Sequence, residues 1–314
     1  MEEALYSHLG FFNTDQVRSD KEGDFLTSPE VSKYFGKIIR NWIHSESNLK
    51  NIIEIGSGTG SLIEQIGIKE ITAVELSSTA REELIKKGID THTTIDELTT
   101  KTSDLIFGNE ILDNIPCSIG LYRDEVWYEK VVLLEENSLA YDLKPMRNKE
   151  LDWVNKNNIV PNEDYEFEIQ VNIDKFLNSV IKKINPGKIL LFDYGYEQQN
   201  RDKRMYSSLL RTYKNHHLSV DPIDDPGNID ITYDVNFSSI SSELKYLGYD
   251  VTLKLQRDFL LDNGFNIFFD ELQEKYIAAE GIEKLKINSE LNGMKAIVDS
   301  NGLGGFYCLI AEKL

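Results

Sequence analysis

The stretch Asn51–Gly60, which reads NIIEIGSGTG, decides the fold of this chain. Its first five residues are mostly apolar and predict a strand, and its glycines predict a tight turn into a helix. Short apolar runs then alternate with helical patterns as far as Phe107, as expected for β-α-β units on a parallel sheet. We therefore expect an α/β fold with a Rossmann-like sheet that begins at Asn51.

The glycine spacing and two acidic residues indicate which ligand this loop binds. Glycines at 56, 58 and 60 follow the pattern GxGxG, whereas dinucleotide-binding loops usually follow GxGxxG. Glu54 lies two positions before the first glycine, where it would repel a pyrophosphate and attract an amino-acid ammonium. Glu75 ends the next predicted strand, where a carboxylate can accept hydrogen bonds from both ribose hydroxyls. This combination favours S-adenosyl-L-methionine as cofactor over a nicotinamide dinucleotide or a merely structural turn.

A second candidate segment, Gly108–Pro116 (GNEILDNIP), follows the predicted strand SDLIF. It lies at the carboxyl end of the sheet, where open α/β folds bind ligands. Glu110 and Asp113 fit the role of catalytic carboxylates, because a carboxylate can hold a guanidinium bidentately and accept its proton. Two alternatives stay open. Asn109 alone could position an amine or amide, or Asp113 could cap a helix while Glu110 is simply solvated.

Two further candidates come from the second half of the chain. Asp193 ends the predicted strand KILLFDYG and is expected to face the same crevice as a third carboxylate, or else to be a buried structural residue. His216 is a candidate base near neutral pH. Neither His216 nor the adjacent His217 pairs with carboxylates at the spacing of metal ligands, so we expect no metal.

The pattern along the chain predicts one elaborated domain over 1–314. Residues 1–48 are expected to form a helical cover, because Thr27-Ser28-Pro29-Glu30 is a helix-start signal ahead of an amphipathic run. Segments 119–184 and 196–236 are expected to be insertions into the sheet. The first is expected to contain an antiparallel hairpin, and the second a long loop over 201–236 without regular structure.

Composition limits the partners and the compartment. The chain has 53 acidic residues against 34 lysines and arginines, a formal net charge of -19, which disfavours nucleic acid and anionic membranes. This charge suits a cationic small molecule or a basic protein segment, and equally a protein whose charge only keeps it in solution. Its two cysteines, Cys117 and Cys308, lack the spacing of a disulfide framework or a zinc site. No signal peptide or membrane-spanning run is recognised, so a cytoplasmic location is expected.

Beyond these local signals, the chain resembles the MidA family of methyltransferases, whose mitochondrial member is a complex I assembly factor and protein arginine methyltransferase. The blocks that carry the resemblance span nearly the whole chain: Met1–Tyr6, Gly23–Glu30, Asn109–Pro116, Asp193–Gly195, Asp225–Gly227, Asp230–Phe237 and Asn292–Met294. The resemblance implies a Rossmann-like class I methyltransferase sheet with an N-terminal helical segment and inserted substrate-binding elements. It also implies S-adenosyl-L-methionine as donor and a protein arginine as acceptor.

The glycine loop and the resemblance together predict the cofactor contacts. These are Thr27, Pro29, Glu54, Gly56, Gly58, Thr59, Gly60, Glu75, Leu76 and Asn109. Two other functions stay open. One is a cofactor-stabilised module that assists assembly of a partner with little turnover, and the other is methylation of a small molecule, which would need a closed pocket.

Overall fold

The structure is a computed structural model. It describes residues 1–13, 27–46, 49–99, 103–136, 138–203, 209–214, 217–218 and 221–313.

A seven-stranded sheet forms the centre of the molecule, with strand order β15-β16-β9-β4-β1-β2-β3. Its strands are β1 (Ile52–Ile55), β2 (Ile71–Val74), β3 (Thr91–His92), β4 (Ser103–Asn109), β9 (Ile184–Asp193), β15 (Asp250–Leu255) and β16 (Tyr307–Lys313). Strand β16 runs antiparallel to both of its neighbours, whereas β1 pairs in parallel with β2 and β4, and β4 with β9. The predicted α/β Rossmann-like sheet is therefore confirmed.

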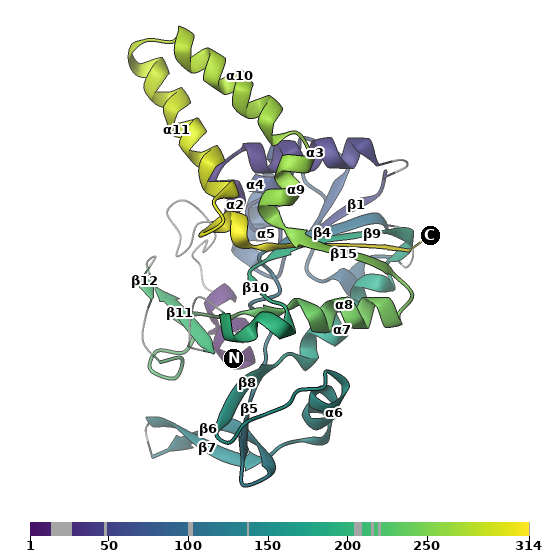
Figure 1. Cartoon of the computed structure of the whole chain (residues 1–314), viewed down its shortest axis with the longest axis vertical. Helices are drawn as coiled ribbons and strands as arrows, with labels where there is room; N and C mark the ends of the chain where they lie inside the picture. The colour runs from purple at the N-terminus through teal and green to yellow at the C-terminus, as the bar shows by residue number, and fades with distance from the viewer. Residues whose placement is uncertain are drawn as a thin grey trace.

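Helices cover both faces of this sheet because alternate residues of each strand point to opposite sides. On β4, Leu105 and Phe107 belong to one apolar cluster and Ile106 to the other. The first cluster takes side chains from α3 (Tyr34–Ser45), α4 (Ser61–Ile66) and α9 (Gln256–Asp262). The second takes them from α7 (Val171–Ile181) and α8 (Phe237–Tyr246). Helices α7 and α8 lie on the other side of the sheet from α3 and α9 (Figure 1). Helix α5 (Ser78–Lys86) connects β2 to β3.

The N-terminal segment contains α1 (Glu2–Tyr6), the 3-10 turn η1 (Phe11–Asn13) and α2 (Ser28–Val31), followed by α3. Helix α2 begins where the sequence predicts, with Thr27 as N-cap and a proline in its first turn. The predicted amphipathic helix is divided, because the chain leaves helical geometry at Ser32, where ψ is 118°. The short α2 lies against α11 and α4, and the N–H of Ser28 donates to Glu110, the residue after the carboxyl end of β4.

The first expected insertion contains a separate antiparallel sheet with strand order β7-β6-β5-β8. Its elements are β5 (Ser118–Arg123), β6 (Val126–Glu135), β7 (Ser138–Pro145), α6 (Asn148–Lys156) and β8 (Tyr165–Ile169). The predicted hairpin is β6–β7. Helix α7, which the sequence places within 119–184, packs instead on the central sheet through Ile173, Leu177 and Val180.

The second expected insertion is more regular than its sequence suggests. The prediction of a long loop without secondary structure is wrong, because the segment includes β11 (Leu210–Lys214), β12 (His217–Leu218) and β13 (Asp230–Tyr233), which form a small antiparallel sheet. Two further short strands, β10 (Gly195–Tyr196) and β14 (Val235–Asn236), pair in parallel, and the 3-10 turn η3 (Gln198–Lys203) follows β10. Long-range pairing of β11 with β13 supplies order that local sequence does not show.

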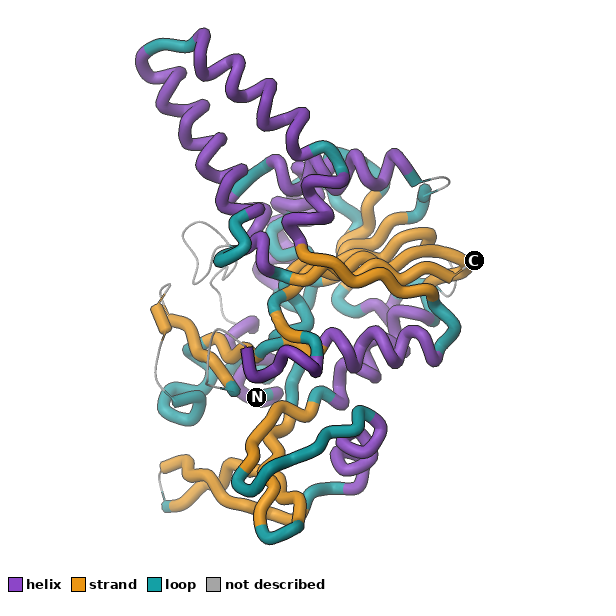
Figure 2. The backbone as a smooth tube through the Cα atoms, in the orientation of Figure 1, coloured by secondary structure: helices purple, strands orange, loops and turns teal. Residues whose placement is uncertain are grey.

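A helical arm formed by α10 (Phe265–Ala278) and α11 (Gly281–Val298) projects from the body (Figure 2). Leu272, Leu291, Met294 and Ile297 from the two helices join the first apolar cluster. Short 3-10 turns η2 (Ile95–Glu97) and η4 (Leu303–Gly305) complete the described elements. Within the described ranges, no helix is both long and apolar enough to span a bilayer.

Candidate active site

An open cavity of about 260 Å³ lies at the carboxyl ends of β1, β2 and β4, where open α/β sheets bind ligands. Its wall also includes residues of the N-terminal segment. Predicted cofactor residues that line it are Thr27, Pro29, Glu54, Gly56, Gly58, Thr59, Glu75, Leu76 and Asn109. Gly60 is not among the described lining residues.

The glycine loop makes the turn from β1 into α4. Gly56, Gly58 and Gly60 all have positive φ, at 69°, 50° and 84°, a region that side chains with a Cβ rarely adopt. The Gly56 N–H donates to the carbonyl oxygen of Val74 at 2.8 Å, which fixes the loop to β2. Gly60 is the N-cap of α4, so its contribution is to the turn rather than to the cavity surface.

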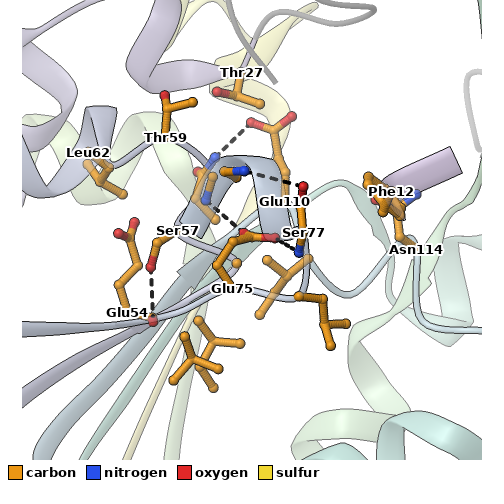
Figure 3. A pocket seen from close by; sticks show the side chains of 18 of the residues that line it. Phe12, Thr27, Glu54, Ser57, Thr59, Leu62, Glu75, Ser77, Glu110 and Asn114 are labelled. Atoms are coloured by element: carbon orange, nitrogen blue, oxygen red, sulfur yellow. Dashed lines mark hydrogen bonds between the residues drawn. The ribbon is translucent and has the colours of Figure 1, made fainter. Parts of the chain in front are cut away.

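Glu75 links β2 to the glycine loop. Its Oε2 accepts the N–H of Gly58 at 2.9 Å, and its Oε1 accepts the N–H of Ser77 at 2.7 Å (Figure 3). Burial raises the pKa of the Glu75 carboxyl, and the hydrogen bonds from Ser77 and Gly58 oppose that rise. Each carboxylate oxygen retains acceptor capacity, so this geometry fits two ribose hydroxyls.

Glu54 is a buried acid, and one of its carboxylate oxygens has no hydrogen-bond partner among the described residues. Its side chain is only 2% exposed although it lines the cavity, and its Oε2 has no hydrogen-bond partner among the described residues. Burial raises the pKa of this carboxyl well above its usual value. An orphaned buried carboxylate is costly, and an ammonium such as that of a methionine moiety would satisfy it. These residues therefore fit the amino-acid and ribose parts of S-adenosyl-L-methionine.

The pair Asn109–Glu110 forms another part of the wall. Asn109 Nδ2 donates to Glu110 Oε1 at 2.9 Å, and the Ser28 N–H donates to the same oxygen at 3.2 Å. The described residues leave Asn109 Oδ1 buried without a partner. Burial raises the pKa of Glu110 to about 8, against the lowering effect of the Asn109 hydrogen bond. Glu110 also has a φ of 52°, an unusual conformation for a residue with a side chain.

The other predicted catalytic residues lie elsewhere. Asp193 does not face the cavity as expected, because its Oδ2 accepts the N–H groups of Leu112 and Asp113 and its Oδ1 that of Tyr194. Asp113 is also absent from the described cavity wall and accepts the Tyr194 hydroxyl. Burial raises the pKa of Asp113 to about 6. His216 lies outside the residues that the structure describes.

The described wall of the cavity is acidic. It contains four glutamates and no lysine, arginine or histidine; the glutamates are Glu30, Glu54, Glu75 and Glu110. A low-dielectric cavity with this charge favours cations over anions. The described residues contain no cluster of three or more side chains that could ligate a metal ion.

Sequence reasoning missed several lining residues. Tyr6 and Phe12 stack with ring centroids 5.5 Å apart, and the Tyr6 hydroxyl donates to the carbonyl oxygen of Asn114 at 3.1 Å. All three line the cavity. Tyr6 and Asn114 belong to blocks that resemble the MidA family, and this resemblance could have identified them as site residues. No sequence feature singled out Phe12.

The central strand order, the GxGxG turn and the two acids define the class of S-adenosyl-L-methionine-dependent methyltransferases. A family model described as "Putative S-adenosyl-L-methionine-dependent methyltransferase" matches residues 36–252. The chain belongs to this family, so it is a methyltransferase that uses S-adenosyl-L-methionine.

Relatives support the same assignment. The chain is 26% identical to the Caenorhabditis elegans "Protein arginine methyltransferase NDUFAF7 homolog, mitochondrial", over 83% of this chain and 70% of that protein. It is 24% identical to the Danio rerio "Protein arginine methyltransferase NDUFAF7, mitochondrial", over 85% and 72%. These names contradict the predicted cytoplasmic location, which is therefore wrong: lack of a recognisable targeting pattern was a poor guide to compartment.

The fold has a close counterpart among solved structures. A COG1565 superfamily member from Burkholderia thailandensis, crystallised with S-adenosyl-homocysteine, superposes with a TM-score of 0.86 at 21% identity, covering 99% of this chain and 86% of that one. The agreement over nearly the whole chain means that the central sheet and the described additional elements share one architecture with that protein.

Proposed function

We propose that this chain methylates an arginine side chain of a partner protein, with Glu110 holding the guanidinium and receiving its proton. The observation that carries the proposal is the pair Asn109–Glu110 in a cavity whose described wall contains only acidic charges. The names of the relatives, protein arginine methyltransferases, agree with it.

The pair offers acceptors where a guanidinium offers donors. Both hydrogen bonds that Glu110 receives from the described residues end on Oε1, which leaves Oε2 for a ligand. Asn109 Oδ1 is a second buried acceptor beside it. A guanidinium presents five N–H donors in a planar fork, so it can satisfy both oxygens at once. A lysine ammonium would match this planar arrangement less well.

Proton transfer follows from the same geometry. When bound, S-adenosyl-L-methionine supplies an electrophilic methyl group. The chain must orient the acceptor nitrogen, exclude water and remove one proton as the nitrogen is methylated. Because burial raises the pKa of Glu110 to about 8, its carboxylate is a stronger base than an ordinary glutamate. Glu110 therefore fits the role of proton acceptor in its ionised form, whose share grows as the pH rises through about 8.

The partner is proposed to present the arginine in a basic segment. Formal net charge is -19 for the whole chain, and the described cavity wall lacks basic residues. Attraction between opposite charges raises encounter rates and falls with ionic strength. A basic protein segment therefore suits this surface better than nucleic acid does.

The test uses purified protein, S-adenosyl-L-methionine carrying a labelled methyl group, and a lysate from the same source. Label is expected in protein and, after acid hydrolysis, in methylarginine. Glu110→Gln should lower the initial rate by about a hundredfold, the size of a lost general-base contribution. Glu274→Gln, which makes the same charge change on the exposed surface of α10, is the matched control and should keep the rate.

Three outcomes would contradict the proposal. Label confined to small molecules would indicate a metabolite acceptor. Label in a protein residue other than arginine would exclude a guanidinium as the methylated group. An undiminished rate with Glu110→Gln would show that Glu110 does not accept the proton.

A further inference from the structure

The loop that carries Glu110 is fixed by residues from two other parts of the chain. We propose that Tyr233, at the end of β13, is a positioning residue that holds Glu110 in its catalytic orientation. This inference rests on the proposed role of Glu110. It assigns a function to the small β11–β13 sheet, which has no counterpart in the seven-stranded core.

The Tyr233 side chain reaches the loop from outside the central sheet. Its ring is fully buried, and its hydroxyl lies 2.9 Å from the carbonyl oxygen of Leu112 and 2.7 Å from that of Ile115. The single hydroxyl proton is thus shared between two carbonyls of one turn. The Tyr233 N–H also donates to the carbonyl oxygen of Asp113 at 3.2 Å.

The end of β9 contacts the same turn, and there Asp193 accepts hydrogen bonds from its N–H groups. Asp193 Oδ2 accepts the N–H groups of Leu112 and Asp113 at 2.8 and 3.3 Å, and Glu110 donates its own N–H to the carbonyl oxygen of Phe192 at 2.8 Å. Tyr233 therefore binds carbonyl groups and Asp193 binds amide groups of one short segment. Few backbone conformations of the segment satisfy both sets of bonds.

Glu110 needs such restraint because its backbone is strained. A φ of 52° in a residue with a side chain costs on the order of 1 kcal/mol and persists only when surrounding contacts impose it. If the turn at Leu112–Ile115 is released, Glu110 can relax toward negative φ. Its carboxylate would then leave the Ser28 N–H and Asn109 Nδ2, which now orient it.

The small sheet holds Tyr233 itself in place. Its Cα is paired with that of Leu210 in the β11–β13 ladder, and the neighbouring Asp234 forms an ion pair with Arg211 at 2.9 Å. Tyr233 also joins the apolar cluster under the central sheet. The inserted sheet thus holds the Tyr233 hydroxyl in a fixed position against the loop after β4.

The experiment compares Tyr233→Phe, which removes only the hydroxyl, with Tyr34→Phe, which removes a hydroxyl bonded to Glu290 between α3 and α11. Amide hydrogen exchange over residues 110–116 is measured in the full chain, together with the initial rate of label transfer into lysate protein. Tyr233→Phe should speed exchange and lower the maximal rate at saturating S-adenosyl-L-methionine by about tenfold to a hundredfold. The KM for S-adenosyl-L-methionine and the affinity for S-adenosyl-homocysteine should stay unchanged.

Tyr34→Phe should change neither the exchange of this segment nor the maximal rate. A maximal rate in Tyr233→Phe within twofold of wild type, with or without faster exchange, would overturn the inference. A KM that rises in parallel with a falling rate would also overturn it, because it would indicate damage to the cofactor site. Failure of the proposed function is seen separately, as full activity of Glu110→Gln or as absence of methylarginine.

Discussion

Ile111 packs so closely on Gly56 that a Cβ at Gly56 would lie 2.4 Å from Ile111 Cγ2. Gly56 belongs to the glycine loop after β1, and Ile111 follows Glu110 in the loop after β4. The cofactor loop and the proposed acceptor loop are therefore in direct contact. One added methyl group at this position would disturb both.

Gly56→Ala should accordingly weaken S-adenosyl-homocysteine binding by roughly tenfold to a hundredfold and slow methyl transfer. The substitution combines a strained φ of 69° with a clash against Ile111, and overpacking a filled site typically costs about 1–3 kcal/mol. Isothermal titration calorimetry measures the affinity. Gly88→Ala is the control, because Gly88 has a φ of 75° but nothing within 4 Å of its added Cβ. Equal losses in both variants would show that strain alone is responsible.

Glu54→Gln should weaken S-adenosyl-homocysteine binding by about 1–3 kcal/mol, roughly tenfold to a hundredfold, because a charge-assisted hydrogen bond to the ligand ammonium is lost. Burial raises the pKa of Glu54 well above its usual value, and an ammonium ligand beside it favours the ionised carboxylate, so ligand binding should lower this pKa. Ligand binding should therefore release protons at any pH where the free carboxyl is protonated, and the affinity should rise with pH across that range. Calorimetry in buffers of different ionisation enthalpy measures the release, which the variant should reduce. If the variant releases as many protons on binding as the wild type, Glu54 does not contact the ligand ammonium.

Glu75→Ala should weaken the same binding by about 1–3 kcal/mol if both ribose hydroxyls bind the carboxylate. The variant also leaves the N–H groups of Gly58 and Ser77 without their acceptor. Adenine alone separates these effects, because it lacks the ribose: its affinity should change much less than that of S-adenosyl-homocysteine. Equal losses for both ligands would mean that Glu75 only supports the loop.

Most of the predicted cofactor residues line one cavity, and the sequence could bring the glycine loop and its two acidic residues together because these are close along the chain. The strand, the glycine turn and Glu54 lie within one ten-residue stretch, and Glu75 ends the next strand. Spacing along the chain therefore translates directly into spacing at the sheet edge. The strand ends that carry Asn109 and Glu110 were located for the same reason.

The remaining features depend on contacts between distant segments. Tyr233 and Leu112 are 121 positions apart, and no periodicity relates them. Asp193 was placed at the correct strand end, but the direction of its side chain depends on the amide groups of a loop 80 positions earlier. Order in the 201–236 segment likewise comes from pairing of β11 with β13, whose short runs have little strand signal alone.

The rate of methyl transfer should rise with pH through about 8 at low substrate concentrations, where the free enzyme determines the profile. Glu110 must be ionised to take a proton, and burial raises its pKa to about 8. Initial rates between pH 6 and about 10 measure this limb. Glu110→Gln should remove the limb, and a wild-type rate that is independent of pH across 7–9 would contradict the assignment of Glu110 as the base.

Glu110→Gln should also stabilise the ligand-free protein at alkaline pH. Glu110 has a pKa of about 8 in the folded state against 4.5 as its ordinary value, so the folded chain binds this proton more tightly than the unfolded chain. Between those two values the unfolded state loses the proton first, and the free energy of unfolding falls as pH rises. Above about pH 8 the whole penalty of the buried charge is present, and below about pH 4.5 it is absent. Glutamine keeps the acceptor oxygen for Ser28 and Asn109 without that charge. Urea unfolding at pH 9 should show a gain of up to about 5 kcal/mol, because each unit of pKa difference corresponds to about 1.4 kcal/mol. The gain should shrink to nothing near pH 4.5. A gain of equal size at both pH values would mean that packing rather than ionisation is responsible.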